Sequence, residues 1–304
     1  MMIALRDTDS AGIASEFRRA RTRAGSPAMG MVLTMVIVAD EDDADAAMEM
    51  GREASHEHPA RVLGVILGDA RGASQVDAQV GTGSGWTGET ALIRLEGEVV
   101  GHAESVVLPL LLPDSPVAVW WPTDAPADPA ADPLGALGQR RITDAAAATR
   151  AKTTAMSTQC RSYVKGNTDL AWTRITPWRA LLAAALDQHQ LKVQRASVTA
   201  ERISPSADLL AAWLRDRLRV EVEQTTSAGP GITEVVLETA AGAVSITRTD
   251  GALATFSTPN RPDRPIALKR RGTPELLAEE LRRLDEDDVY AATVASMVAK
   301  RKKR

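Results

Sequence analysis

The residues of this chain best suited to recognition chemistry are tryptophans and arginines gathered in three segments, 108–122, 139–144 and 166–179. Aromatic residues make up only 3% of the chain, yet four of its six tryptophans lie in these segments. Tryptophan and arginine are enriched among the residues that dominate binding at protein interfaces. We therefore predict that the following residues are partner-binding or interface-supporting groups: Trp120, Trp121, Arg140, Arg141, Asp144, Asp169, Trp172, Arg174, Trp178 and Arg179.

The adjacent Trp120 and Trp121 lie in an apolar run of strand length. Because neighbouring residues of a strand face opposite sides, one ring in the core leaves the other pushed outward or under a covering element. Tryptophan is highly buried on average whether or not it meets a partner. The same segments are therefore also compatible with an inter-domain core, in which the arginines pair with Asp144 and Asp169.

A second hypothesis concerns a small ligand. Guanidinium groups bind phosphate oxygens in a bidentate manner, so Arg140, Arg141, Arg174 and Arg179 would suit a sugar phosphate if the fold made them converge. A weaker third possibility is nucleic acid at the basic tail 300–304, but five cationic residues on a chain of net charge -4 are usually solvated, and we predict no nucleic-acid partner.

Catalytic and metal-binding motifs are missing. The sequence has no Gly-Lys dipeptide and hence no phosphate-binding Walker loop, and the glycine-rich stretch 81–88 lies between two strand candidates, which is typical of a hairpin. His56 and His58 point about 200° apart on a helix, and Cys160 has no Cys or His neighbour in its segment. We predict no catalytic residue, no metal site and no cofactor.

The elements that position the first two segments alternate between strand and helix. Apolar runs at 31–38 and 61–67, joined by a helix over 40–56, predict a βαβ unit in a buried parallel sheet. Residues 123–133, which are rich in Pro, Ala and Asp, predict an exposed, extended loop. Further predicted elements are helices over 10–24 and 100–111 and strands over 75–80, 90–95 and 117–121.

The second half begins with helices, at 144–163 and from 176 onward. A strand, a helix and a strand at 193–200, 206–218 and 219–224 then predict a second βαβ unit, with Ser204 or Ser206 as the helix cap. Alternation with period two predicts an antiparallel meander over 233–238, 243–248, 253–257 and 265–269, followed by a final helix from 273.

These elements predict an α/β protein with two domains. We expect an N-terminal α/β layered domain with a mixed sheet over 1–140 and a helical bridging segment over 141–190. A C-terminal mixed α/β domain over 191–299 ends in the meander, and 300–304 form a disordered basic tail. Thirty-six basic against 40 acidic residues, one cysteine and no apolar run of membrane-spanning length predict a cytoplasmic protein with no membrane partner.

Three sequence blocks carry a family resemblance. They are Leu-Pro-Leu-Leu-Leu-Pro-Asp-x-Pro-Val-x-x-Trp-Trp-Pro from residue 108, Arg-Arg-Ile-Thr-Asp from residue 140, and Asp-Leu-Ala-Trp-Thr-Arg-Ile-Thr-Pro-Trp-Arg-Ala-Leu-Leu-Ala from residue 169. In these blocks, and along nearly its whole length, the chain resembles the glucose-6-phosphate dehydrogenase assembly protein family, OpcA. The abundance of alanine and arginine resembles the actinobacterial branch.

The resemblance implies a non-enzymatic role, in which the protein binds glucose-6-phosphate dehydrogenase and promotes its active oligomer or conformation in the oxidative pentose phosphate pathway. It implies no catalytic residues. Photosynthetic relatives link the partnership to redox control through cysteines. This chain departs from that pattern, because its single Cys160 cannot form an internal disulfide.

Overall fold

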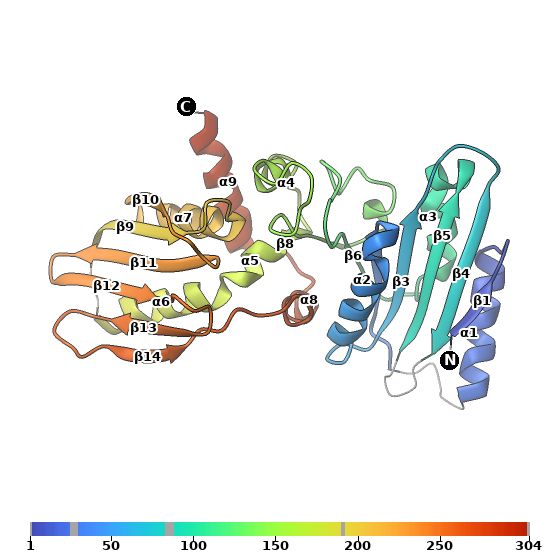
Figure 1. Cartoon of the computed structure of the whole chain (residues 1–304), viewed down its shortest axis with the longest axis horizontal. Helices are drawn as coiled ribbons and strands as arrows, with labels where there is room; N and C mark the ends of the chain where they lie inside the picture. The colour runs from blue at the N-terminus through green and yellow to red at the C-terminus, as the bar shows by residue number, and fades with distance from the viewer. Residues whose placement is uncertain (1, 25–29, 83–87, 190–191, 303–304) are drawn as a thin grey trace. The chain divides into compact units, whose positions relative to one another are not determined.

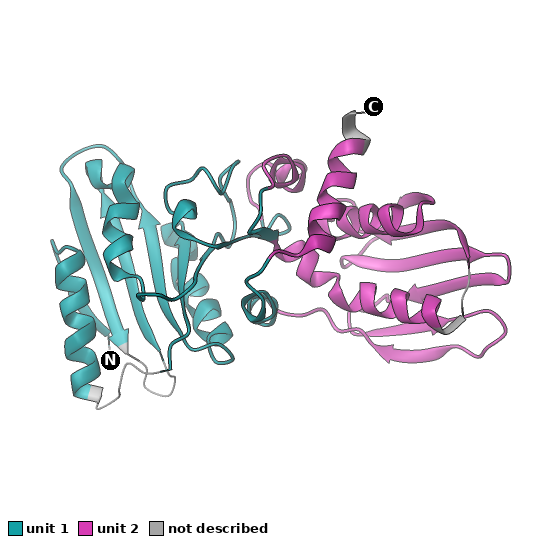
Figure 2. Cartoon of the chain, turned by 180° about the vertical axis from the view of Figure 1, so that it is seen from behind, with its two compact units in different colours: residues 1–147, 164–168, 273–285 teal, residues 148–163, 169–272, 286–304 magenta. Residues whose placement is uncertain are grey.

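The computed structural model describes residues 2–24, 30–82, 88–189 and 192–302 (Figure 1). The chain divides into two compact units, shown in different colours in Figure 2. Unit 1 comprises residues 1–147, 164–168 and 273–285, and unit 2 comprises 148–163, 169–272 and 286–304. Each unit contains a mixed sheet with helices, so the predicted fold class is confirmed.

Unit 1 is built around an eight-stranded sheet. Strands β5, β3, β2, β6 and β7 are parallel to one another, while β4 is antiparallel to both β1 and β5. The predicted βαβ unit is confirmed, because β2 and β3 are parallel and joined by α2 (Glu41–Ala54). In sheet order the strands are β1 (Met2–Leu5), β4 (Gln75–Thr82), β5 (Glu89–Glu96), β3 (Ala60–Leu67), β2 (Leu33–Ala39), β6 (Val117–Trp120), β7 (Arg140–Thr143) and β8 (Asn167–Asp169).

Helix α1 (Ser10–Ala24) buries Ile13 and Phe17 in the main core of unit 1, as their spacing predicts. The core continues through alternate residues of β3, β5 and β6, including Val117, Val119 and Trp121. Helix α8 (Thr273–Arg282) belongs to this unit although it lies near the end of the chain, and it packs beside α2. The hairpin predicted around 81–88 is confirmed by the antiparallel pairing of β4 with β5, while residues 83–87 lie outside the described part.

Two predictions for unit 1 are wrong. The helix expected over 100–111 is instead the 3-10 turn η1 (Gly97–His102), the short helix α3 (Ala103–Val107) and the 3-10 turn η2 (Leu108–Leu110), because Pro109 interrupts the α-helical hydrogen bonds. Residues 123–133 are not an exposed, extended loop. Asp128 Oδ1 accepts hydrogen bonds from Ala130 N and Ala131 N at 3.1 and 3.2 Å, and these bonds fold the segment into turns.

Unit 2 is built around a six-stranded sheet in the order β10-β9-β11-β12-β13-β14, which can be followed across Figure 1. Strands β9 and β10 are parallel and joined by α7 (Pro205–Leu218), and the remaining pairs form the predicted antiparallel meander. Ser204 Oγ caps α7 by accepting from Ala207 N at 3.3 Å. The strands are β9 (Val193–Ala200), β10 (Glu221–Thr226), β11 (Ile232–Thr239), β12 (Gly242–Thr247), β13 (Leu253–Ser257) and β14 (Arg264–Ala267).

The other helices of unit 2 are α4 (Ala155–Arg161), α5 (Leu170–Arg174), α6 (Thr176–His189) and α9 (Asp288–Lys302). The helix predicted over 144–163 is wrong in its first half, where Ala151 adopts the left-handed region and only Ala155–Arg161 is helical. The tail predicted as disordered is also corrected, because α9 extends to Lys302; residues 303–304 lie outside the described part.

Candidate functional site

The ten predicted residues divide between the two units. Trp120, Trp121, Arg140, Arg141 and Asp144 belong to unit 1, whereas Asp169, Trp172, Arg174, Trp178 and Arg179 belong to unit 2. We therefore describe them as two clusters, each within its own unit.

In unit 1, the two adjacent tryptophans lie on opposite faces of the sheet and both are buried. Trp121 belongs to the main core with Val117 and Val119, and Trp121 N donates to Ile142 O at 3.0 Å. Trp120 is paired with Ile142 across β6 and β7 and has no exposed surface. Both rings therefore contribute packing to this end of the sheet.

Arg140 fixes α8 to the sheet from the Trp120 face. It is 4% exposed, and its guanidinium donates to Glu280 Oε2 at 2.5 Å and to Asp285 O at 3.2 Å. Glu280 is 6% exposed. This buried ion pair, together with the hydrogen bond to Asp285 O, specifies how α8 packs against β7, because moving either group would break a contact between buried charges.

Arg141 points to the opposite face of β7. Its guanidinium donates to Asn167 Oδ1, Gly138 O and Lys165 O at 2.5, 2.6 and 2.5 Å, which ties the segment 164–168 to the sheet. Burial lowers the pKa of Arg141, although Asp128 opposes this effect. Since Arg140 and Arg141 face opposite sides and bind internal acceptors, their geometry does not favour a shared phosphate ligand.

In unit 2, Trp172 is the centre of an aromatic cluster. Its Nε1 donates to Asp287 Oδ2 at 2.8 Å, and the guanidinium carbon of Arg179 lies 3.6 Å from the ring centroid. The ring also packs against Tyr290 at 5.4 Å between centroids, and Tyr290 packs edge-on against Tyr163 at 5.6 Å. These contacts join α4, α5, α6 and α9 into one body.

Asp287 joins the cluster to the start of α9. Its Oδ1 accepts from Val289 N and Tyr290 N at 2.9 Å, while Oδ2 accepts from Trp172. A carboxylate that caps a helix N-terminus satisfies backbone N–H groups that have no partner within the helix. The same side chain thus begins α9 and orients Trp172.

Trp178 lies on α6 beside the end of β12. The Arg248 guanidinium carbon is 5.0 Å from the Trp178 ring centroid, and Arg248 donates to Leu268 O at 2.8 Å and to Ile232 O at 3.1 Å. Burial lowers the pKa of Arg248, and the nearby Arg270 adds to this effect. Trp178 and Arg248 therefore stabilise the covered face of the six-stranded sheet.

Of the remaining predicted residues, Asp169 and Asp144 accept hydrogen bonds from backbone N–H groups, and Arg174 is half-buried. Asp169 Oδ1 caps α5 by accepting from Ala171 N at 2.8 Å, and Asp144 Oδ1 accepts from Ala146 N at 3.2 Å. Arg174 ends α5 and is half-buried.

Sequence reasoning missed several residues of these clusters. Glu280 and Asp287 lie more than a hundred residues from their partners, so no local pattern points to them. Tyr163 and Tyr290 are the only tyrosines in the chain. The signal that was available for predicting an aromatic cluster is the composition, with six tryptophans against two tyrosines and two phenylalanines.

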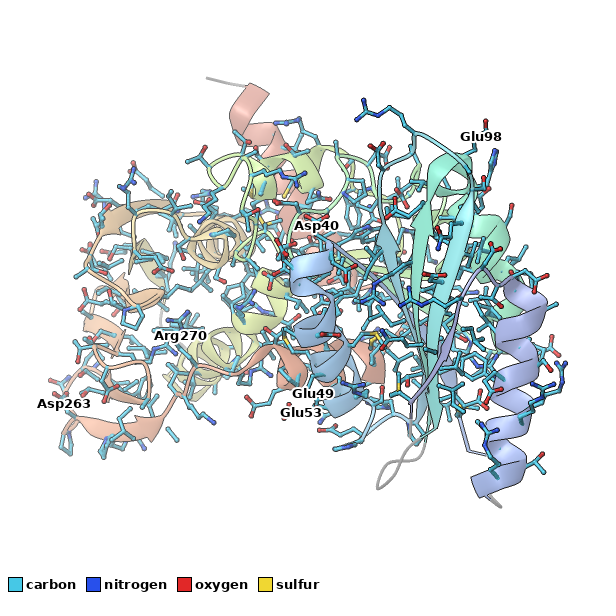
Figure 3. The ribbon with its side chains drawn as sticks, turned by 45° about the vertical axis from the view of Figure 1, so that its right-hand side comes forward. Asp40, Glu49, Glu53, Glu98, Asp263 and Arg270 are labelled. Atoms are coloured by element: carbon cyan, nitrogen blue, oxygen red, sulfur yellow. The ribbon has the colours of Figure 1, made fainter. Side chains whose placement is uncertain are left out.

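In a doubly wound sheet, a nucleotide binds at the carboxyl ends of the strands, at the point where the strand order reverses. In unit 1 this point lies between β2 and β6, because β3 and β6 pair with opposite edges of β2. A dinucleotide site there needs a glycine-rich turn and free N–H groups at the helix N-terminus. This chain instead has Asp40, labelled at the start of α2 in Figure 3, followed by Glu41, Asp42 and Asp43 in the first turn. Thr123 Oγ1 donates to Asp43 Oδ2 at 3.4 Å. Four carboxylates disfavour a pyrophosphate.

Within 2–24, 30–82, 88–189 and 192–302, no group of three or more His, Cys, Asp or Glu side chains has the arrangement of a metal site. In the same residues, none of the helices is long and apolar enough to cross a membrane.

Comparisons with known proteins identify two matching family models. The model described as the glucose-6-phosphate dehydrogenase subunit N-terminal domain matches residues 51–160, and the one described as the C-terminal domain of the same subunit matches 165–294. A search of curated proteins finds no match.

Two solved structures share a low overall similarity with the chain. A 3-ketoreductase from Actinomadura kijaniata, in complex with TDP-benzene and NADP, is 10% identical, with 89% of this chain and 97% of that chain covered and a TM-score of 0.47. An inositol dehydrogenase homolog from Azotobacter vinelandii, complexed with NADH and myo-inositol, is 9% identical, with 92% and 89% covered and a TM-score of 0.43. At these values neither similarity carries a functional argument.

Proposed function

Because the chain belongs to the OpcA family of glucose-6-phosphate dehydrogenase subunits, we propose that it binds this dehydrogenase and promotes its active oligomer or conformation. The observation that carries the proposal is the match of both domain models, in order, over residues 51–294. The actinobacterial type stays a prediction, as does a cytoplasmic location, which suits a chain with one cysteine.

The proposed role is non-enzymatic. The acidic first turn of α2 supports this, since its carboxylates occupy the position from which a helix N-terminus would bind the pyrophosphate of a nicotinamide cofactor. The two clusters also fit the role of support. Arg140, Arg141 and Trp172 bind internal acceptors, so we propose that the predicted residues hold each unit in the shape that its partner recognises.

Activation imposes a thermodynamic condition. A protein that raises the activity of the dehydrogenase must bind the active state more tightly than the inactive one. Linkage makes this effect reciprocal. If this protein raises the affinity of the dehydrogenase for a ligand by some factor, that ligand raises the affinity of the dehydrogenase for this protein by the same factor. We therefore expect the Kd of the complex to fall when NADP or glucose 6-phosphate is present, if either ligand favours that state.

The experiment is a titration of this protein into glucose-6-phosphate dehydrogenase from the same source, with the rate of NADP reduction measured at subsaturating glucose 6-phosphate. We expect a saturable increase in rate, and no NADP reduction by this protein alone. If the rate of NADP reduction does not rise, and calorimetry detects no binding at the same concentrations, the proposal is overturned. NADP reduction by this protein alone would overturn its non-enzymatic part.

A further inference from the structure

The six-stranded sheet of unit 2 has one covered and one open face. Along β9, β11, β12 and β13 buried residues alternate with half-buried or exposed ones, as the period of two in a strand requires. Helix α7 packs against β9 and β10, and Trp178 of α6 lies against Arg248, so these helices are on the side of the buried residues.

Strand register identifies the open face. Ser197, Val236, Ser245 and Ser257 are successive partners across β9, β11, β12 and β13, and Glu223 of β10 is paired with Ser197. Directly paired residues of neighbouring strands point to the same side of a sheet. This row therefore runs across the open face.

Contacts between side chains confirm this assignment along two further rows. Thr199 Oγ1 and Thr225 Oγ1 are 2.8 Å apart, and Thr247 Oγ1 donates to Glu234 Oε1 at 3.2 Å. In the row that contains Glu221, Arg195 and Glu238, Arg195 Nη2 lies 4.0 Å from Glu221 Oε2. The side chains of the open face are mostly short, so few of them project far from the sheet.

Charge is divided unevenly over this face. Glu221 and Glu223 of β10 and Glu234 and Glu238 of β11 point outward, with Arg195 as the one cation among the outward strand residues. The outward positions of β12, β13 and β14 are all uncharged, although 25% of the residues of the whole chain are charged. Depletion of charged residues is typical of the core of a protein interface.

The face is large enough for a stable contact. Six strands about 4.8 Å apart, each roughly six residues long at about 3.3 Å per residue, give a flat area of roughly 600 Å². A standard interface buries about 800 Å² on each partner, so this face and the loops at its rim approach the required area.

We propose that the open face of the six-stranded sheet is the surface on which glucose-6-phosphate dehydrogenase docks. The uncharged outward residues of β12–β14 form one half of the contact, and the four glutamates of β10 and β11 in the other half face lysines or arginines of the enzyme. This inference rests on the proposed function. A second copy of the chain is the less suitable occupant, because two such faces would oppose eight glutamates with two arginines.

The test compares three variants with matched controls. Ser245→Arg places a long cation in the uncharged half, and Thr255→Arg repeats the change at an exposed position in case the first variant fails to fold. The double variant Glu234→Lys/Glu238→Lys reverses the charge of the two outward glutamates of β11. Glu53→Lys and Glu98→Lys reverse exposed charges of unit 1 and serve as controls (Figure 3).

Affinity for the dehydrogenase is measured by calorimetry at low and high salt, with a melting curve for each variant. We expect both arginine variants to weaken binding at least about tenfold, which corresponds to ~1.4 kcal/mol. The glutamate reversal should weaken binding at low salt and reduce its salt dependence. The controls should stay within about twofold of the wild type.

Each other outcome has a distinct meaning. If the wild type binds and the folded variants bind equally well, the docking surface lies elsewhere and only this inference fails. If the wild type itself does not bind, the proposed function fails. If light scattering shows a dimer of this protein that Ser245→Arg dissociates, a second copy occupies the face and the inference is overturned.

Discussion

Trp172 makes specific contacts at its ring nitrogen and at its ring face, with Asp287 and Arg179. Trp172→Phe keeps much of the packing but removes the hydrogen bond to a carboxylate. We expect the free energy of unfolding to fall by about 2 kcal/mol, since a hydrogen bond to a charged group is worth roughly 1.5–3 kcal/mol. Urea denaturation followed by circular dichroism measures this change.

Trp213→Phe is the matched control. Trp213 lies on α7, is half-buried, and has no hydrogen-bond or ring partner among the residues described. Its replacement should cost less than about 1 kcal/mol. Equal losses for the two variants would contradict the importance that we assign to the Asp287 contact.

The Arg140–Glu280 pair gives a second prediction at the residue scale. Arg140→Met removes the buried positive charge that pairs with Glu280, so we expect the free energy of unfolding to fall by about 3–5 kcal/mol. The double variant Arg140→Met/Glu280→Leu removes both charges and should recover at least half of that loss. A double-mutant cycle in guanidinium chloride checks the coupling, and additive losses would show that the pair does not act as a unit.

Single residues also show where sequence reasoning succeeds and where it stops. The period of two correctly places Trp120 and Trp121 on opposite faces, because backbone geometry alone decides it. The pattern could not identify Glu280 or Asp287 as partners, since long-range contacts depend on the tertiary arrangement. Whether the ten predicted residues contact the dehydrogenase stays a prediction.

At the scale of elements, the segment after β6 is packed rather than extended. Pro129 is buried, and a Cβ added to Gly135 would come within 1.8 Å of Pro129 O and 3.0 Å of Trp121 Cη2. Gly135→Ala should therefore destabilise unit 1 by about 1–3 kcal/mol, because a backbone atom cannot give way as a side-chain tip can. Thermal unfolding measures the loss.

Gly101→Ala provides the comparison, since nothing lies within 4 Å of a Cβ at that position. We expect it to change stability by less than about 0.5 kcal/mol. Should Gly135→Ala be as well tolerated as Gly101→Ala, residues 123–137 would not be packed as described.

Long elements with a strong apolar periodicity were predicted from the sequence, and very short ones were not. The strands of the βαβ units and the meander were predicted to within about two residues, because their apolar alternation is strong and turn residues bound them. Strands β1, β7 and β8 were missed, since three or four residues carry little periodic signal. The helix expected from 100 failed because Pro109 outweighed its apolar periodicity.

At the scale of the whole molecule, the final residues complete both units. Residues 273–285 contribute α8 and Glu280 to unit 1, and 286–304 contribute α9 and Asp287 to unit 2. The linear division at 140 and 190 stays a prediction. A chain ending at Gly272 should lose the cooperative unfolding transition of both units, because each loses a helix and a carboxylate that binds a buried side chain.

Calorimetry of that truncated chain, beside one ending at Ala299, tests the claim. The longer chain retains α8 and most of α9 and should unfold within a few degrees of the full chain. A sharp, unchanged transition in the chain ending at Gly272 would mean that both units fold without their C-terminal helices.

The most direct measurement is light scattering on a sizing column, with this protein mixed with glucose-6-phosphate dehydrogenase from its own source and activity assayed across the peak. We expect a joint peak whose mass exceeds that of either protein and whose specific activity is higher than that of the dehydrogenase alone. Separate elution with unchanged activity, in the presence of NADP and glucose 6-phosphate, would contradict it.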